Sequence, residues 1–426
     1  MTARDFTARR VGIALAVIAA SVIAYATLSP AGAPVDRSLY GPVCVICDGT
    51  PGVDLIANVV LFVPLGIGLA LAGTRSGRAI VATAALSLAI ELLQYRFIQG
   101  RDASFVDVAT NVIGGSLGVA AGGHWRVLVA PGARASALSS ATAALLLVAT
   151  IWATAWGLTP SLPEPPWFSI RNAGTPLKPS GRIVDARVAG EPLTGDSVRN
   201  GETVRAGLLQ GEPAVVTAIV SASGEQSTNL LQVIDRSIDD VVVLSRVKED
   251  ATFSARNRAR GARLRELAVR LRGFFRGFGE DTVHVAGRVQ NGSLVIQARH
   301  AGTVREEALP LTPRLGWALL FPATRLGSES VLAGALWIAA LILPFSYWSA
   351  RAARLSGNRA LWWLARAVVV IACFALPARV MPIATSLWWE WAVGILTIVA
   401  GEIVVASSLE RWDPSLQRAR SSSDVP

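Results

Sequence analysis

Apolar runs about as long as a bilayer is thick constrain the fold of this sequence more than any other feature. A membrane-spanning helix needs about 20 predominantly apolar residues. Only 16% of the chain is charged, whereas soluble domains are about one quarter charged, so a multi-pass membrane protein is predicted. The first run also resembles a cleaved signal peptide, but its length favours a retained span. The expected spans are about 11–28, 54–73, 79–95, 105–122, 137–158, 329–348, 361–380 and 387–409.

Arginines in the short loops predict how these spans are oriented. Cytoplasmic loops carry an excess of Lys and Arg. With both termini cytoplasmic, the arginine-rich loops all lie inside, which predicts an inner or plasma membrane protein with residues 159–328 extracytoplasmic. The same loops explain much of the net charge of +10, and no nucleic-acid-binding motif accompanies it, so nucleic acid is not an expected partner. The inner arginines are Arg9, Arg10, Arg75, Arg78, Arg126, Arg134, Arg351, Arg354, Arg359, Arg411, Arg418 and Arg420.

Residues 159–328 combine prolines, turn residues and short alternating runs. Several short strands separated by turn signals predict a β-sandwich or jelly roll of antiparallel sheets. Asn291-Gly292 is a strong hairpin signal between the last two runs. The arginine-rich stretch 256–276 fits either a basic amphipathic helix or a loop followed by a strand. The expected strands are 214–221, 230–234, 241–247, 282–289 and 293–299.

The predicted architecture is an α-helical polytopic membrane protein of about eight transmembrane helices with an inserted all-β extracytoplasmic sandwich domain. Residues 1–158 form a five-helix membrane domain, residues 159–328 the sandwich, and residues 329–426 a three-helix membrane region with a cytoplasmic tail. By strand pattern and size the sandwich resembles the concanavalin-like (LamG-type) folds, which often bind sugars. The aromatic residues available for sugar stacking lie at the edges of this domain: Trp167, Phe168 and Trp317.

Polar side chains interrupt three of the apolar runs at one predicted depth, and we call this group the polar seam. Each of the three spans carries one acid and one amide, and the orientation above puts both near the outer end of the span. Ionisable groups within a membrane indicate a functional site. Arg101 lies in the external loop between two of these spans. The members of the polar seam are Asp54, Asn58, Glu91, Gln94, Arg101, Asp107 and Asn111.

The chemistry of the polar seam leaves three interpretations open. Arg101 and two helix N-termini favour binding of an anionic headgroup. Crowded carboxylates in a low dielectric also favour acid–base chemistry, with Glu91 and Asp107 as the catalytic candidates. Alternatively the seam only holds helices together, with Asp54 and Asp107 as N-caps.

At these positions the sequence resembles the VanZ-like family of membrane proteins. The matching pattern is N-x-x-L-F-x-P-L-G at 58–66, E-x-x-Q at 91–94, G-R at 100–101 and D-x-x-x-N-x-x-G at 107–114, and the resemblance covers about residues 10–158. It implies a bacterial membrane protein of the cell envelope, in a family named for a member associated with resistance to the glycopeptide teicoplanin. It implies no settled biochemical activity.

Cys44 and Cys47 form a C-x-x-C pair in the first predicted external loop. A disulfide is the usual state outside the cytoplasm, while unpaired thiols or a metal or redox site remain alternatives. No cofactor motif or metal-ligand spacing is recognisable, so neither a cofactor nor a metal is expected.

Other charged residues are interpreted as solvated or interfacial. Asp235, Asp239 and Asp240 are expected in a solvated loop, and the arginines of 256–276 on a solvated face or against anionic headgroups. Trp388, Trp389 and Trp391 beside Glu390 indicate an interfacial aromatic belt, and Glu402 is expected to snorkel.

Three functions follow, of which the first is favoured. The polar seam binds an anionic envelope lipid or a glycan precursor, with a link to the glycopeptide-antibiotic response implied by the family resemblance. The second is a membrane enzyme that acts on a lipid-linked or peptidoglycan-related substrate, although no nucleophile–base triad is recognisable. The third is a scaffold whose external domain binds a glycan or protein.

Overall fold

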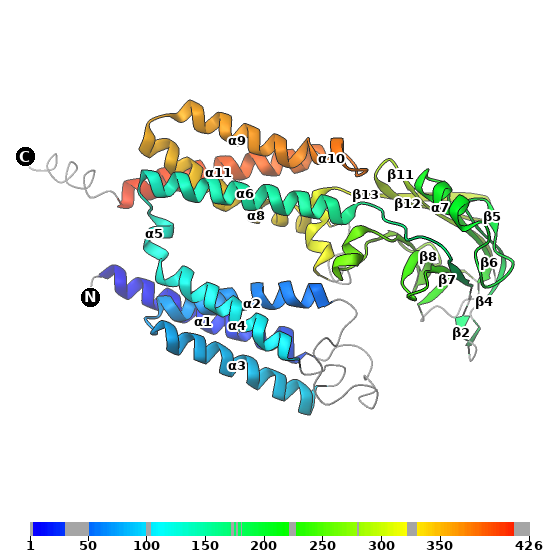
Figure 1. The fold of residues 1–426 in the computed structure, drawn as a ribbon, viewed down its shortest axis with the longest axis horizontal. Coiled ribbons are helices and arrows are strands. Elements are labelled where there is room, and N and C mark those ends of the chain that lie inside the picture. Colours follow the sequence, from blue (N-terminus) through cyan, green and yellow to red (C-terminus); the bar gives the residue numbers. More distant parts are fainter. Residues whose placement is uncertain are drawn as a thin grey trace, which may run out of the picture. The chain divides into compact units, whose positions relative to one another are not determined.

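The structure, a computed structural model, divides the chain into two compact units, Met1–Ala135 and Ser136–Pro426. Each unit is described here by itself (Figure 1). The described residues are 3–29, 51–98, 104–171, 174–175, 178–179, 181–220, 227–278, 281–321 and 330–412.

Unit 1 is helical, and glycines set the distance between two of its helices. α2 and α4 pack so closely that a Cβ added at Gly114 or Gly118 would overlap the carbonyl oxygen of Val59 or Val63. Small residues allow such close approach between membrane helices. The helices are α1 (Ala3–Leu28), α2 (Pro51–Leu71), α3 (Ser76–Phe97), α4 (Phe105–Gly123) and the short α5 (Trp125–Val129).

Unit 2 contains a helical bundle on which a β-sandwich is carried (Figure 1). Apolar side chains of α6, α8, α9 and α11 form one cluster, and Trp152 Nε1 donates to the carbonyl oxygen of Ala372 at 3.0 Å. The helices are α6 (Ala133–Leu158), α7 (Gly201–Leu209), α8 (Val331–Ser356), α9 (Arg359–Phe374), α10 (Pro377–Val380) and α11 (Trp388–Trp412).

Seven helices of the described residues are long and apolar enough to cross a membrane, so the chain is a multi-pass membrane protein. They are α1 to α4, α6, α8 and α11. The predicted span at 361–380 is instead the 16-residue α9 followed by α10. α9 carries the buried Arg366 near its middle, which lowers its apolar character.

Two antiparallel sheets form the β-sandwich. One has the strand order β1-β7-β8-β9-β10, and the other β13-β12-β11-β6-β4-β5. Side chains from both fill a common apolar core, where Phe253 of β9 packs against Gly287 of β11. The strands are β1 (Phe168–Ile170), β4 (Gly181–Val188), β5 (Glu191–Pro192), β6 (Ala214–Val220), β7 (Thr228–Ile234), β8 (Asp240–Val247), β9 (Asp250–Ala255), β10 (Ala268–Leu271), β11 (Asp281–Gln290), β12 (Ser293–His300) and β13 (Thr303–Pro310), with a separate pair β2 (Gly174–Thr175) and β3 (Lys178–Pro179).

All five predicted strands are present, at β6, β7, β8, β11 and β12. The predicted hairpin joins β11 to β12, and Asn291 and Gly292 both have positive φ, at 50° and 69°. Two central residues with positive φ match the right-handed twist of a hairpin. The arginine-rich stretch is a loop followed by a strand, with the 3-10 turn η1 (Arg258–Ala262) before β10.

Buried polar contacts fasten the sandwich to the helical bundle of unit 2. Thr312 precedes the 3-10 helix η2 (Pro313–Leu319), and its Oγ1 donates to Oε1 of Glu390 at 2.7 Å. The Nε of Arg314 lies 3.6 Å from the same carboxylate oxygen. Glu390 is 0% exposed, whereas Trp388 beside it is 80% exposed. Thr312 before η2 and Arg314 within it thus both pair with an acid in the first turn of α11.

Candidate functional site

Glu91 is the most constrained acid of the polar seam. It lies in the last two turns of α3, is 5% exposed, and its Oε2 accepts a hydrogen bond from the backbone N–H of Ser104 at 2.8 Å. Ser104 is the N-cap of α4, with its Oγ accepting from the N–H of Asp107 at 3.4 Å. The carboxylate of one helix therefore binds the first residues of the next, which fixes where α4 begins.

Asn111 lies in the second turn of α4 and is 3% exposed. Its Nδ2 donates to Oγ of Ser87 on α3 at 2.9 Å. Its Oδ1 is buried and has no hydrogen-bond partner among the described residues. A buried acceptor without a donor costs about 1–3 kcal/mol, so this oxygen is a position where a donor would be stabilising.

The remaining members of the seam lie at the same end of unit 1. Nε2 of Gln94 donates to the carbonyl oxygen of Thr27, near the end of α1, at 2.8 Å. Asp54 and Asn58 are half-buried in the first two turns of α2. Val59, next to Asn58, faces Gly114, one turn beyond Asn111. These contacts bring together one end of each of the helices α1, α2, α3 and α4.

Two details of the predicted seam change. Asp107 is half-buried in the first turn of α4, three residues after the cap, so Ser104 and not Asp107 is the N-cap. Asp54 lies in the first turn of α2, which begins at Pro51. Arg101, Cys44 and Cys47 lie outside the described residues, so their predicted roles stay predictions.

Two serines complete the seam and were not predicted from the sequence. The hydroxyl of Ser87, which is 0% exposed, accepts from Asn111, and the backbone N–H of Ser104 donates to Glu91. The S-x-x-D spacing from Ser104 to Asp107 is the start signal of a helix, and it would have located this cap. Ser87 is not marked by any such pattern. A single serine is common in apolar helices, so its presence there does not indicate a polar contact.

The polar atoms in the described part of the seam are mainly acceptors. Its acids are Asp54, Glu91 and Asp107, and the free atom of Asn111 is an oxygen. Such a set suits a ligand rich in hydroxyl or amine donors. Among the described residues, no group of three or more His, Cys, Asp or Glu could hold a metal ion.

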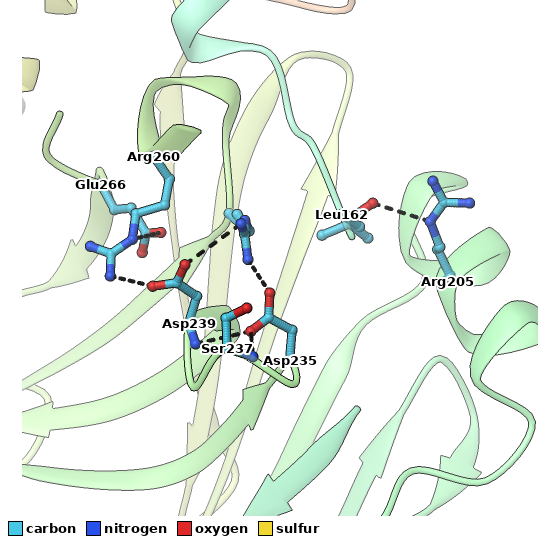
Figure 2. A network of polar contacts seen from close by, with 8 residues as sticks. Leu162, Arg205, Asp235, Ser237, Asp239, Arg260 and Glu266 are labelled. Atoms are coloured by element: carbon cyan, nitrogen blue, oxygen red, sulfur yellow. Dashed lines mark hydrogen bonds and ion pairs between the residues drawn. The ribbon is translucent and has the colours of Figure 1, made fainter. Parts of the chain in front are cut away.

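A second polar network lies in the β-sandwich, between the β7–β8 turn and η1 (Figure 2). Arg256 Nη1 donates to Oδ2 of Asp235 at 2.7 Å, and Arg260 Nη2 donates to Oδ1 of Asp239 at 2.7 Å. Asp235 also accepts from the N–H groups of Ser237 and Asp239, at 2.8 and 3.0 Å. Asp235 is 8% exposed, so the prediction of a solvated acidic loop is wrong for it.

The pKa values of two acids in this network are shifted in opposite directions. Burial alone would raise the pKa of Asp235, but the hydrogen bonds from Asp239, Arg256 and Ser237 outweigh it and lower the pKa. Burial raises the pKa of Glu266 to about 7. The Nε of Arg260 lies 3.9 Å from Oε1 of Glu266, which is too far for a hydrogen bond to offset that burial.

The aromatic residues proposed for sugar stacking divide into buried and accessible ones. Trp167 is 0% exposed and Trp317 6%, so neither can stack on a sugar. Phe168 is 39% exposed on the edge strand β1 and lines a groove of about 710 Å³. Arg171, Arg182 and Asp185 line the same groove.

Comparison with known proteins identifies the helical part of unit 1. A search of curated proteins and a search of solved structures found no match. The model of the VanZ/LLP1 family matches residues 14–125, which include the described seam residues and the close α2–α4 crossing. The N-terminal part of this multi-pass membrane protein therefore carries a VanZ-like domain.

Proposed function

We propose that the protein binds an envelope lipid whose headgroup carries both an anionic group and hydroxyl groups, as a lipid-linked glycan precursor does. The observation that carries the proposal is the buried, unpaired Oδ1 of Asn111, in the same helix-end region as the buried carboxylate of Glu91. A headgroup hydroxyl would donate to Oδ1 of Asn111. The predicted orientation puts the seam at the extracytoplasmic face, where Arg101 and the start of α4 would attract the anionic group.

The binding proposal is tested by the lipid that co-purifies with the full-length protein. We expect Asn111→Ala and Glu91→Gln each to reduce the lipid retained per protein about tenfold. The first substitution removes an acceptor oxygen, and the second removes the negative charge of the carboxylate. Glu91→Gln keeps an oxygen that can accept from Ser104, so the start of α4 is preserved. Extraction of the purified variants and quantification of the lipid by mass spectrometry measures the effect.

Ser87→Ala is the matched control, because it removes the internal partner of Asn111 Nδ2 and leaves Oδ1 in place. Under the proposal this variant retains its lipid. If the seam only joins helices, Ser87→Ala and Asn111→Ala lose the same small amount of stability, about 0.6 kcal/mol, and both retain the lipid content of the wild type. That result would contradict the proposal.

An enzyme at the same seam is the second candidate, favoured by the burial of Glu91. If Glu91 is a general base, Glu91→Gln still binds the lipid but accumulates it unconverted. The mass of the retained lipid separates the two functions: a different molecule in wild type and variant supports catalysis, and a lower amount of one molecule supports binding.

A further inference from the structure

A charged cluster lies between three helices of unit 2, at the end of the bundle that holds the turn from α8 to α9. Arg366 of α9 is 1% exposed. Its Nη1 donates to Oε1 of Glu402 on α11 at 2.6 Å, and its Nε donates to Oγ of Ser349 on α8 at 2.9 Å. The guanidinium carbon lies 4.8 Å from the ring centroid of Trp363. The prediction that Glu402 is a lone, snorkelling acid is therefore wrong.

Arg354 of α8 binds the same glutamate. Its Nη2 lies 3.3 Å from Oε2 and 3.2 Å from the carbonyl oxygen of Glu402. We call Arg354, Arg366 and Glu402 the arginine cluster. It holds two permanent positive charges and one negative charge, and Arg351, which is 9% exposed, lies one turn before Arg354 on the same helix.

The arginine cluster also has more donors than acceptors. The Nη2 of Arg366 and the Nε of Arg354 are buried and have no hydrogen-bond partner in the described part of the chain. A buried charged donor without a partner is costly, and an unbalanced buried charge costs more than a paired one. An additional anion at this position would satisfy both the spare donors and the spare charge.

We propose that the arginine cluster binds the anionic oxygens of a phosphate group. The planar guanidinium fork matches the geometry of phosphate oxygens and can bind them in bidentate fashion. The side chains of Arg354 and Glu402 are 29% and 23% exposed, which leaves the cluster open at its edge. The phosphate belongs either to a phospholipid headgroup or to a free ion.

The surroundings of the cluster favour a headgroup as the source. Trp362 and Trp363 lie in the first turns of α9, and Trp363 is 49% exposed. Tryptophan is enriched where a membrane meets water. The predicted orientation places this end at the cytoplasmic leaflet, whose anionic lipids attract basic groups between helices.

Glu402 separates this proposal from a simpler role as a helix-joining ion pair. If an anion binds the two arginines, the carboxylate of Glu402 competes with it, so Glu402→Gln should tighten anion binding. The amide oxygen still accepts from Nη1 of Arg366, which preserves the contact between α9 and α11. If the cluster only joins helices, the same substitution weakens the bundle and creates no affinity for phosphate.

The experiment titrates the full-length protein in neutral detergent and counts bound lipid by native mass spectrometry. The probes are phosphatidylglycerol, the zwitterionic phosphatidylcholine, and inorganic phosphate as a competitor. We expect wild type to bind phosphatidylglycerol at least about tenfold more tightly than phosphatidylcholine, and Arg354→Gln to lose about tenfold in affinity, since a charge-assisted hydrogen bond is lost. Glu402→Gln should bind more tightly than wild type.

Arg359→Gln is the matched control, because Arg359 is an exposed arginine at the start of α9, seven residues before Arg366. It should stay within about twofold of wild type by the affinity scale above. If millimolar inorganic phosphate displaces phosphatidylglycerol, a free ion is a sufficient ligand. If it does not, the lipid headgroup is the ligand. Either result, together with the loss in Arg354→Gln, supports a phosphate site. Equal affinity of wild type and Arg354→Gln, or weaker binding by Glu402→Gln, would overturn the proposal.

Discussion

Replacement of Gly118 by alanine is expected to lower the free energy of unfolding of the VanZ-like domain by about 3 kcal/mol, the upper part of the range for overpacked cores. The new methyl group would overlap the carbonyl oxygen of Val63, which is backbone and cannot rotate away. α2 and α4 must therefore separate along their whole crossing. Thermal unfolding of the detergent-solubilised full-length protein, followed by circular dichroism, measures the loss.

Gly123→Ala provides the comparison on the same helix. A Cβ at Gly123 meets nothing within 4 Å, so this variant should be neutral or gain up to about 1 kcal/mol from helix propensity. The two substitutions have the same chemistry, but Gly118 lies in the packed interior of α4 and Gly123 at its open end. Equal unfolding temperatures for both variants would show that the crossing is looser than described.

Replacement of Glu266 by glutamine is expected to stabilise the β-sandwich at pH 8 and to have little effect at pH 4.5. Burial raises the pKa of Glu266 from 4.5 to about 7, so between these values the folded chain binds the proton more tightly than the unfolded chain. The contribution of protonated Glu266 to the stability of the sandwich is therefore fully present below pH 4.5, and it is lost as the pH rises through 7. The loss amounts to about 3 kcal/mol, and glutamine avoids it.

The measurement is the unfolding temperature of wild type and Glu266→Gln across this pH range, where the two curves should diverge as pH rises. Neighbouring charges modulate the effect: Arg260 and Arg256 lower this pKa, whereas Asp239 and Asp240 raise it. Glu249→Gln serves as the control, because Glu249 is 50% exposed and paired with Arg276. Parallel curves for wild type and Glu266→Gln would contradict the burial argument.

Topology allowed the seam to be predicted, and the limits of that prediction are physical. Hydropathy and loop arginines determine the direction of each helix, so residues such as Glu91 and Asn111 could be placed at one depth from the sequence. Their partners could not be named, because Ser87 and Ser104 pair with them across helices, at sequence separations of 24 and 13 residues. Neither the hydroxyl of Ser87 in an apolar helix nor the backbone N–H of the cap residue Ser104 gives a periodic signal of such a contact.

The same limit explains Glu402. Judged by its own segment it is a lone acid, yet its partner Arg366 is 36 residues away on a helix that was expected to be an ordinary span. In the β-sandwich, alternation revealed the strands that have one buried face, such as β6. β13 was missed because Thr303–Pro310 is mostly exposed and polar, so its pairing with β12 leaves no hydrophobic pattern.

α11 carries two acids with polar partners, the buried Glu390 and the partly exposed Glu402. Glu390 in its first turn binds Thr312 at the base of the sandwich, and Glu402 binds Arg366 three turns later. The rise of an α-helix separates these two acids by about 18 Å along the axis. Because the helix is stiff between them, a sliding or rotation of α11 that releases one acid also displaces the other. A displacement of α11 at Glu402 would therefore also change the contact of Glu390 with Thr312 at the base of the sandwich.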